Sequence, residues 1–163
     1  MTIREKKKFK LLQQKNRVAY AAKDCFYAHG FSRTSMDDIA RYAAMSKKTI
    51  YKFFKNKEDL LNYVITLVHD DFDEKINPIL HSKKLTFLEK MVLMTHLVST
   101  EFENTPLTFI EDLKLNNPTM YKIIADFKQD RVHNGFAFFI KEGVEKGIFR
   151  SELPVELLVY SFA

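Results

Sequence analysis

Apolar residues recur every three or four positions along most of the chain, the spacing that predicts amphipathic helices. The first stripe starts at Val18 and ends before Gly30, where glycine supplies the left-handed conformation of a helix C-cap. The sequence contains no strand-like alternation of useful length and no internal repeat. The pattern predicts an all-α fold. Its helices are expected to run from the charged N-terminal arm to residue 29 and then over about 35–43, 47–53, 56–78, 88–102, 107–115 and 119–146.

Two short helices joined by a tight turn are predicted between residues 35 and 53. Thr34 and Asp37 resemble a capping box at the start of the first helix, and Ser46 fits the N-cap of the second. If Ile50 is buried, the opposite face of the second helix exposes Lys47, Lys48, Thr49, Tyr51 and Lys52. This arrangement is typical of a helix-turn-helix, whose second helix enters the major groove of DNA.

The charge is divided unevenly along the chain and favours a polyanionic partner for the N-terminal part. Residues 1–57 hold fifteen Lys and Arg against four acids, a net charge of +11. Residues 58–163 hold eleven against seventeen, a net of −6, and the two parts give the overall +5. Lysines of the second short helix can neutralise phosphates or donate to guanine. Lys57 opens the next helix, where free backbone N–H groups form a further seat for phosphate.

The segments Gly30 to Ala40 and Ser46 to Leu61 closely resemble the TetR family of bacterial regulators, and the resemblance covers about residues 17–61. It implies a helix-turn-helix DNA-binding domain over 1–56 and a helical effector-binding and dimerisation domain over 57–163. It also implies that Lys47, Lys48, Thr49, Tyr51 and Lys52 read DNA, and that Ser35, Tyr51 and Lys57 anchor phosphates. The sequence departs from the family's pattern at two positions. Ala44 occupies a turn position where the family commonly has glycine, and Lys48 replaces a position often filled by a small residue.

By this resemblance we expect a homodimeric repressor that leaves a palindromic operator in double-stranded DNA when it binds a small, mainly hydrophobic effector. Effector binding is expected to move the fourth helix and so to change the separation of the two DNA-binding parts. The alternative is a similar DNA-binding protein without a small-molecule effector, controlled by a protein partner. An open cavity in the second part would favour the first reading, and a fully packed body would favour the second.

Candidate effector contacts are apolar or aromatic side chains of the second part, each of which ordinary core packing would also explain. The set comprises Phe87, Met91, Phe102, Phe109, Phe127, His133 and Phe136. Met94, Met120, Phe138 and Phe139 could line the same apolar cavity. His96, Glu101 and Glu103 are further candidates for polar groups inside a pocket. The acidic run from His69 to Glu74 is interpreted as a solvated helix face and not as a metal site, and no cofactor is expected.

Several classes of protein are disfavoured by the sequence. The single Cys25 fits a core position in a reducing compartment, and the chain shows neither a signal peptide nor a membrane span. We therefore expect a cytoplasmic protein, associated with the nucleoid when bound to DNA. An enzyme is not expected, because no phosphate loop, nucleophile elbow or zinc spacing is present. Residues 154–163 are expected to form the first turns of a truncated eighth helix, which would weaken dimerisation.

Overall fold

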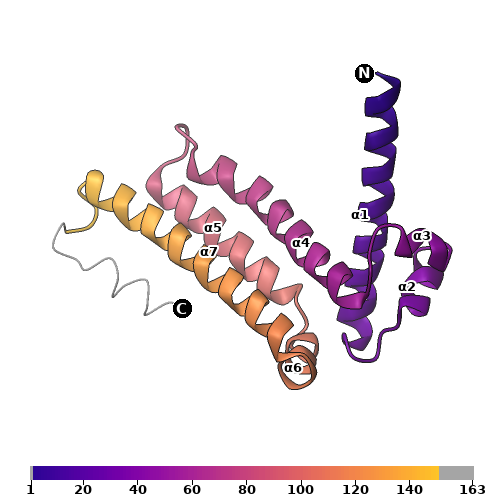
Figure 1. The fold of residues 1–163 in the computed structure, drawn as a ribbon. Helices are drawn as coiled ribbons and strands as arrows, with labels where there is room; N and C mark the ends of the chain where they lie inside the picture. The colour runs from indigo at the N-terminus through magenta and orange to yellow at the C-terminus, as the bar shows by residue number, and fades with distance from the viewer. Residues whose placement is uncertain (1, 151–163) are drawn as a thin grey trace.

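The computed structural model describes residues 2–150, without the side chains of residues 102, 131–134 and 136. Within this range all regular structure is helical, so the predicted all-α class is confirmed. Figure 1 shows α1 standing beside α2 and α3, with the remaining helices extending to one side. The helices are α1 (Ile3–His29), α2 (Met36–Tyr42), α3 (Lys47–Tyr51), α4 (Lys57–Leu80), α5 (Phe87–Glu103), α6 (Leu107–Asn116) and α7 (Pro118–Glu145). The expected eighth helix lies outside the described residues.

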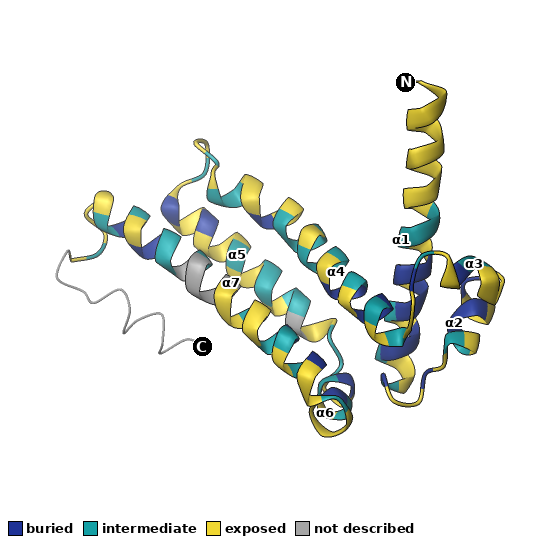
Figure 2. Ribbon diagram, in the orientation of Figure 1, coloured by how far each residue is buried: buried dark blue, intermediate teal, exposed yellow. Residues whose placement is uncertain are grey.

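The first three helices, which we call the head (residues 2–56), close around a small apolar core. Val18 and Phe26 of α1 meet Ile39 of α2 and Ile50 of α3, and all four side chains are 0% exposed. The first half of α1 takes no part in this core and projects beyond it, exposed on all sides (Figure 2). Gly30 ends α1 with φ at 84°, the left-handed region that its predicted capping role requires.

The remaining helices, α4 to α7, form what we call the body (residues 57–150). α4, α5 and α7 lie side by side along much of their length, and α6 lies at the end nearest the head (Figure 1). Asn56 caps α4 by accepting a hydrogen bond from the Asp59 N–H at 2.8 Å. The apolar core continues from Leu60 and Leu61 of α4 into α6 and α7. The expected domain boundary at residues 56 and 57 therefore coincides with the start of α4, while the packing runs across it.

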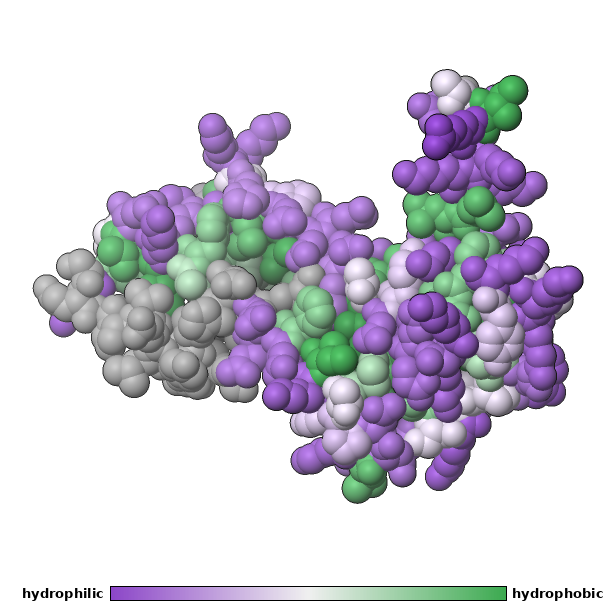
Figure 3. All heavy atoms as spheres, viewed as in Figure 1, coloured by the Kyte–Doolittle hydropathy of each residue, from purple (hydrophilic) through white to green (hydrophobic). Residues whose placement is uncertain are grey.

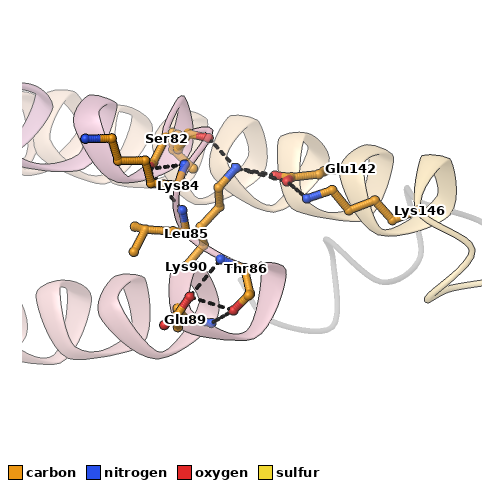
Figure 4. Close-up of polar contacts among 9 residues, drawn as sticks. Ser82, Lys84, Leu85, Thr86, Glu89, Lys90, Glu142 and Lys146 are labelled. Atoms are coloured by element: carbon orange, nitrogen blue, oxygen red, sulfur yellow. Dashed lines mark hydrogen bonds and ion pairs between the residues drawn. The ribbon is translucent and has the colours of Figure 1, made fainter.

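A buried ion pair connects three helices at the end of the body farthest from the head (Figure 4). The Lys90 side chain of α5 is only 5% exposed, and its Nζ lies 2.9 Å from Glu142 Oε1 of α7. The same Nζ donates to the Leu80 carbonyl, at the C-terminal end of α4, at 2.9 Å. Lys146 adds a second ammonium to Glu142 at 2.6 Å. Electrostatic contacts thus fasten the ends of α4, α5 and α7 to one another.

Three predicted helix ends differ from the structure for local reasons. Ser35 and Asp38 form the capping box of α2, where Thr34 and Asp37 were expected. The Thr34 hydroxyl is turned inward and donates to the carbonyls of Cys25 and Gly30. α3 ends at Tyr51, two residues early, and beyond it the Phe53 N–H bonds to the Ile50 carbonyl at the tighter i−3 spacing. α4 continues two residues past Pro78, which in the last turn removes only one hydrogen bond.

Candidate nucleic-acid interface and internal cavity

The helix α3 presents a basic, hydroxyl-bearing face on the outside of the head. The Ser46 Oγ caps it by accepting from the Thr49 N–H at 3.1 Å, and Ile50 fixes its inner face in the head core. The Thr49 Oγ1 is half-buried and lies 2.9 Å from the Ser46 Oγ. The exposed residues of this face are Lys47, Lys48, Tyr51 and Lys52. The structure thus brings together every residue that was expected to read bases.

The turn between α2 and α3 holds the two helices at a fixed angle. Ala44 has φ at 51°, which confirms the predicted left-handed residue at a position where glycine would be less strained. The Met45 N–H donates to the Ala40 carbonyl at 3.0 Å and closes the turn. From α1, the Arg17 guanidinium donates to the Ala43 carbonyl at 2.9 Å. These bonds position α3 relative to α1 without help from the body.

Ser35, an expected phosphate anchor, caps α2. Its hydroxyl donates to Asp38 Oδ2 at 2.5 Å and accepts from the Asp38 N–H at 3.2 Å. These bonds with the Ser35 side chain and backbone, followed by the contact with Arg41, lower the pKa of Asp38 to about 2. Asp37 is paired instead with Lys47 of α3. A phosphate at Ser35 would therefore approach a hydroxyl that already makes two hydrogen bonds.

Lys57, the other expected anchor beside Tyr51, points into the protein. Its Nζ donates to the carbonyls of Phe31 at 2.7 Å and Thr34 at 2.9 Å, and lies 4.3 Å from the centre of the Phe31 ring. Burial lowers the pKa of this ammonium, partly offset by the charges of Glu58 and Asp112. The side chain fastens the α1–α2 loop to α4, so only the backbone N–H at the start of α4 remains available to a phosphate.

A second contact joins the same α1–α2 loop to the body. Asp112 of α6 accepts a hydrogen bond from the Ser32 N–H at 2.8 Å. A Cβ atom placed on Gly30 would lie only 3.1 Å from Asp112 Oδ2, so glycine lets the carboxylate approach the loop closely. Asn116, one turn further along α6, donates to the other carboxylate oxygen at 2.8 Å. The loop that precedes the helix-turn-helix is therefore held from α4 and α6 together.

An apolar cavity of about 160 Å³ lies between α1 and the body helices α4, α5, α6 and α7. Its α4 wall runs from Leu61 to Ile76, a distance of about 22 Å at 1.5 Å per residue, so the cavity is elongated. Tyr27 of α1 lines the cavity and packs on Phe109 of α6 with ring centres 5.1 Å apart. The polar lining groups besides Tyr27 are His69, Glu101, Thr105 and Lys128.

Of the residues expected to contact an effector, Phe109 lines this cavity. Phe127 lies just outside the lining and stacks on His69, which does line it, at 4.3 Å between ring centres. Phe87 packs against the Phe139 ring near the far end of the body, and Met91 is 41% exposed, so neither faces the cavity. The side chains of Phe102, His133 and Phe136 lie outside the described part of the structure.

Met94, one of the side chains expected to line an apolar cavity, also lines it, whereas most of the other lining residues were not singled out from the sequence as effector contacts. The α4 residues were recognised only as a buried stripe, because a periodic pattern does not show whether an apolar face meets side chains or empty space. Glu101 was among the polar candidates and does line the cavity, whereas His96 and Glu103 are exposed. No sequence pattern indicated that Tyr27 and Lys128 would line the cavity, because only the packing of α1 and α7 against α4 brings them to it.

Neither a metal centre nor a membrane anchor emerges from the part of the chain that the structure describes. In that part, no three His, Cys, Asp or Glu side chains are grouped so that they could hold a metal ion. None of its helices has the combination of length and apolar character needed to cross a bilayer. Cys25 is buried in the head core, where burial, followed by the nearby charges of Asp24 and Asp38, raises the pKa of its thiol.

Comparison with known proteins identifies the type of head. The sequence model of a family described as "Bacterial regulatory proteins, tetR family" matches residues 20–64. The HTH-type transcriptional regulator YhgD of Bacillus subtilis is 28% identical over 141 residues, which cover 84% of this chain and 70% of that protein. These matched proteins are transcriptional regulators and not enzymes.

Solved structures extend the likeness to the body. FadR of Bacillus subtilis, solved in complex with stearoyl-CoA, aligns with a TM-score of 0.72 and 22% identity, over 89% of this chain and 80% of that one. The regulator SmeT, solved with triclosan, aligns with a TM-score of 0.70 and 18% identity, over 91% and 74% of the two chains. At these identities the likeness establishes a common fold for α1 to α7.

Proposed function

We propose that the chain is a transcriptional regulator of the TetR family and acts as a homodimeric repressor, released from a palindromic operator by a small, mainly hydrophobic effector. The observation that carries the proposal is the shared wall between head and body. Tyr27 belongs to the helix that braces the DNA-reading pair, and it also lines the cavity. A ligand in that cavity would touch the head directly. Residues 1–56 and 57–163 would then act as reading and sensing domains in the bacterial cytoplasm, on nucleoid DNA.

The exposed face of α3 supplies the chemistry for DNA reading. Lys48 and Lys52 can donate to guanine N7 and O6 or to phosphates, and the Tyr51 hydroxyl can reach a phosphate oxygen. Lys47 would exchange its contact with Asp37 for DNA, whereas Thr49 contributes its methyl group beside the capping hydroxyl. Ser35 and Lys57 act in this proposal mainly through the backbone groups that they hold in place.

The cavity favours an elongated apolar effector. Its lining is mostly aliphatic and aromatic along α4, which suits an acyl chain or aryl group more than a strongly charged molecule. Two regulators with the same fold were solved with stearoyl-CoA and with triclosan, both of which carry large apolar parts. Glu101 and Lys128 would orient the polar end of such a ligand. The cavity also favours an effector over control by a protein partner, which needs no internal space.

Effector entry would reach DNA through the two contacts on the α1–α2 loop. A ligand that displaces the Tyr27 and Phe109 rings moves α6, and with it Asp112. A displacement of α4 moves Lys57 on the same loop. A coupling of about 1–3 kcal/mol between the two sites would lower operator affinity about 5- to 150-fold. In a dimer, a change in the separation of the two heads multiplies the effect, because both half-sites must be met at once.

DNA binding is tested by fluorescence anisotropy on a duplex from upstream of the gene for this protein, beside a scrambled duplex. The wild type should prefer its own duplex and should bind more weakly as salt rises. The double variant Lys48→Gln/Lys52→Gln should bind at least about tenfold more weakly, because charged contacts to DNA are lost. Lys83→Gln/Lys84→Gln removes the same charge at the far end of the body and should bind like the wild type. Equal affinity of both double variants would contradict the proposal.

Effector control is tested by adding stearoyl-CoA or triclosan to the preformed protein–DNA complex. At least one probe should lower operator affinity, and it should raise the melting temperature of the free protein. Val98 lines the cavity, so Val98→Phe should fill part of the space and abolish both effects while DNA binding persists. A wild-type complex that responds to neither probe, with equal melting temperatures in their presence, would favour regulation by a protein partner.

A further inference from the structure

The first half of α1 is a free helical arm. We define the arm as residues 3–16; its exposed part, residues 3–13, projects by about 16 Å, from eleven residues at 1.5 Å each. Figure 2 shows it exposed around its circumference, and its apolar residues Ile3, Phe9 and Leu12 are 89, 54 and 50% exposed. At its base the Lys15 Nζ lies 3.8 Å from the centre of the Tyr63 ring, and Asn16 accepts a hydrogen bond from the Tyr63 hydroxyl at 2.7 Å. Residues 3–13 are exposed throughout. Packing in a core therefore does not account for the exposed residues of the arm.

The arm is strongly basic. It contains Arg4 and five lysines, at 6, 7, 8, 10 and 15, against the single acid Glu5. Figure 3 shows mainly hydrophilic side chains around its free end. Like charges one turn apart, such as Lys6 with Lys10, repel each other and weaken an isolated helix. A polyanion would remove that repulsion and bind a stripe of cations in one step.

The register of α1 directs part of this charge toward the DNA-reading pair. Lys6, Lys10 and Arg17 lie at i, i+4 and i+11, so they share one face of the helix. Arg17 points at the turn between α2 and α3, where its guanidinium donates to the Ala43 carbonyl. Lys6 and Lys10 continue that face beyond the edge of the head.

We propose that the arm is a second DNA-contacting element, which lies along the phosphate backbone beside the base pairs read by α3. The inference rests on the proposed DNA-binding function and adds a site to it. The exposed part of the arm, about 16 Å long, spans about five base pairs at 3.4 Å each, so it contacts phosphates in the flank of each half-site. Its contacts depend on charge and not on base sequence.

The N-terminal cap of the arm and the scatter of its apolar residues also favour DNA as the partner. Thr2 and Glu5 form a capping box at the free end, with the Thr2 N–H donating to Glu5 at 2.6 Å, so the helix is organised before DNA arrives. Preorganisation reduces the entropy lost on binding. Successive residues turn by about 100°, so the apolar side chains of the arm point in different directions. They offer no continuous apolar face of the kind that inserts into a membrane surface.

The test is the salt dependence of binding to a 40-base-pair duplex of mixed sequence, measured by anisotropy with the full chain. The arm variant Lys6→Gln/Lys7→Gln/Lys10→Gln keeps helix propensity and touches no packed residue. The control Lys75→Gln/Lys83→Gln/Lys84→Gln removes equal charge from exposed positions far from the head. The slope of log affinity against log salt should be less steep by about 2–3 in the arm variant, near 0.9 per lost phosphate contact. The control should keep the wild-type slope.

Each other outcome overturns the inference in a distinguishable way. Equal slopes for the arm and control variants would show that only the overall charge matters, while the proposed reading by α3 would stand. Failure of the wild type to bind any duplex at low salt would remove the DNA-binding function and the arm proposal together. An arm variant that keeps its DNA slope but no longer binds phosphatidylglycerol vesicles would make the arm a membrane-surface helix instead.

Discussion

The head and the body are both helical, but their side chains are packed to different degrees. In the head, Phe26 and Phe54 are at most 1% exposed, and the apolar side chains that stay exposed lie on the arm and on the outer faces of the helices. In the body, an internal cavity remains beside α4, and Leu88 and Val92 of α5 are 69 and 61% exposed. The contrast separates a part that must keep its shape from a part that can change it.

Leu61 shows how the two parts are connected. It is 1% exposed, belongs to the apolar core shared with the head, and also lines the cavity. Close-packed side chains move together, whereas a wall that faces empty space can be displaced at small cost. A ligand is therefore expected to deform the cavity side of α4 and to move the head as a rigid unit. The predictions below test this division.

The strongest single tie in the body is the Lys90–Glu142 pair, and Lys90→Ala should have the largest effect. The substitution leaves Glu142 buried with only Lys146 as a partner, and breaking a buried pair costs about 3–5 kcal/mol. Urea unfolding followed by circular dichroism measures the change. The double variant Lys90→Met/Glu142→Leu should recover much of the loss, because it leaves no unpaired charge. A Lys90→Ala protein as stable as the wild type would show that the body is not held in this way.

The same pair predicts a response to acid. Contacts with Lys146 first, and with Lys90, lower the pKa of Glu142. A carboxyl group with a lowered pKa stabilises the fold above its ordinary value, near 4.5, and the stabilisation is lost as the pH falls through the lowered value. Wild-type stability should therefore decline below about pH 4.5, and Lys90→Ala should decline less over that range. Parallel pH profiles for the two proteins would contradict this assignment.

Truncating matched apolar residues compares the two parts directly. Ile39 is 0% exposed in the head core, so Ile39→Ala should cost about 2–5 kcal/mol. Val98 lines the cavity, so Val98→Ala mainly enlarges an existing space and should cost less than about 1 kcal/mol. Urea unfolding of both variants measures the difference. Equal costs would mean that the cavity wall is packed as tightly as the head.

The sequence predicted the fold of the head better than the site in the body, for a physical reason. Helix positions follow from local signals, such as the Ser46 cap and the periodic burial of Ile39 and Ile50, and these were identified to within a few residues. At Ala44, where the family commonly has glycine, the backbone is left-handed, as the resemblance implies. Local signals are sufficient where neighbours in sequence are neighbours in space.

The site depends on contacts between distant segments, which a single sequence does not show. The inward direction of Lys57 follows from carbonyls in the loop more than twenty residues earlier. The absence of Phe87 and Met91 from the cavity wall follows from the rotation of α5 against α7. The contribution of Tyr27 requires α1 to pack on α6. The residue types predicted an apolar pocket, whereas the tertiary packing determines which residues line it.

Asp112 is the polar link between head and body, and Asp112→Ala should loosen it. Loss of a charged acceptor for the Ser32 N–H should cost about 1.5–3 kcal/mol. Hydrogen exchange of the Ser32 amide should become faster, while exchange at Ile39 in the head core should change only as global stability changes. Glu111→Ala, at the exposed neighbouring position, serves as the control. Unchanged Ser32 protection would show that the loop is held without α6.

Ser35→Ala should have the smallest effect on stability and separates a structural role from a DNA contact. Loss of the N-cap of α2 should cost about 1 kcal/mol. The pKa of Asp38, lowered to about 2 by its bonds to Ser35, should rise toward its ordinary value when the serine hydroxyl is removed. Two-dimensional NMR of the carboxyl carbons during an acid titration measures that rise.

Ser35→Thr restores a hydroxyl that can cap α2, so it should return both stability and the low pKa. If operator affinity fell strongly in Ser35→Ala and returned in Ser35→Thr while the Asp38 pKa stayed near 2 throughout, the hydroxyl would serve phosphate and not the cap, and the head would be less self-contained than its packing indicates.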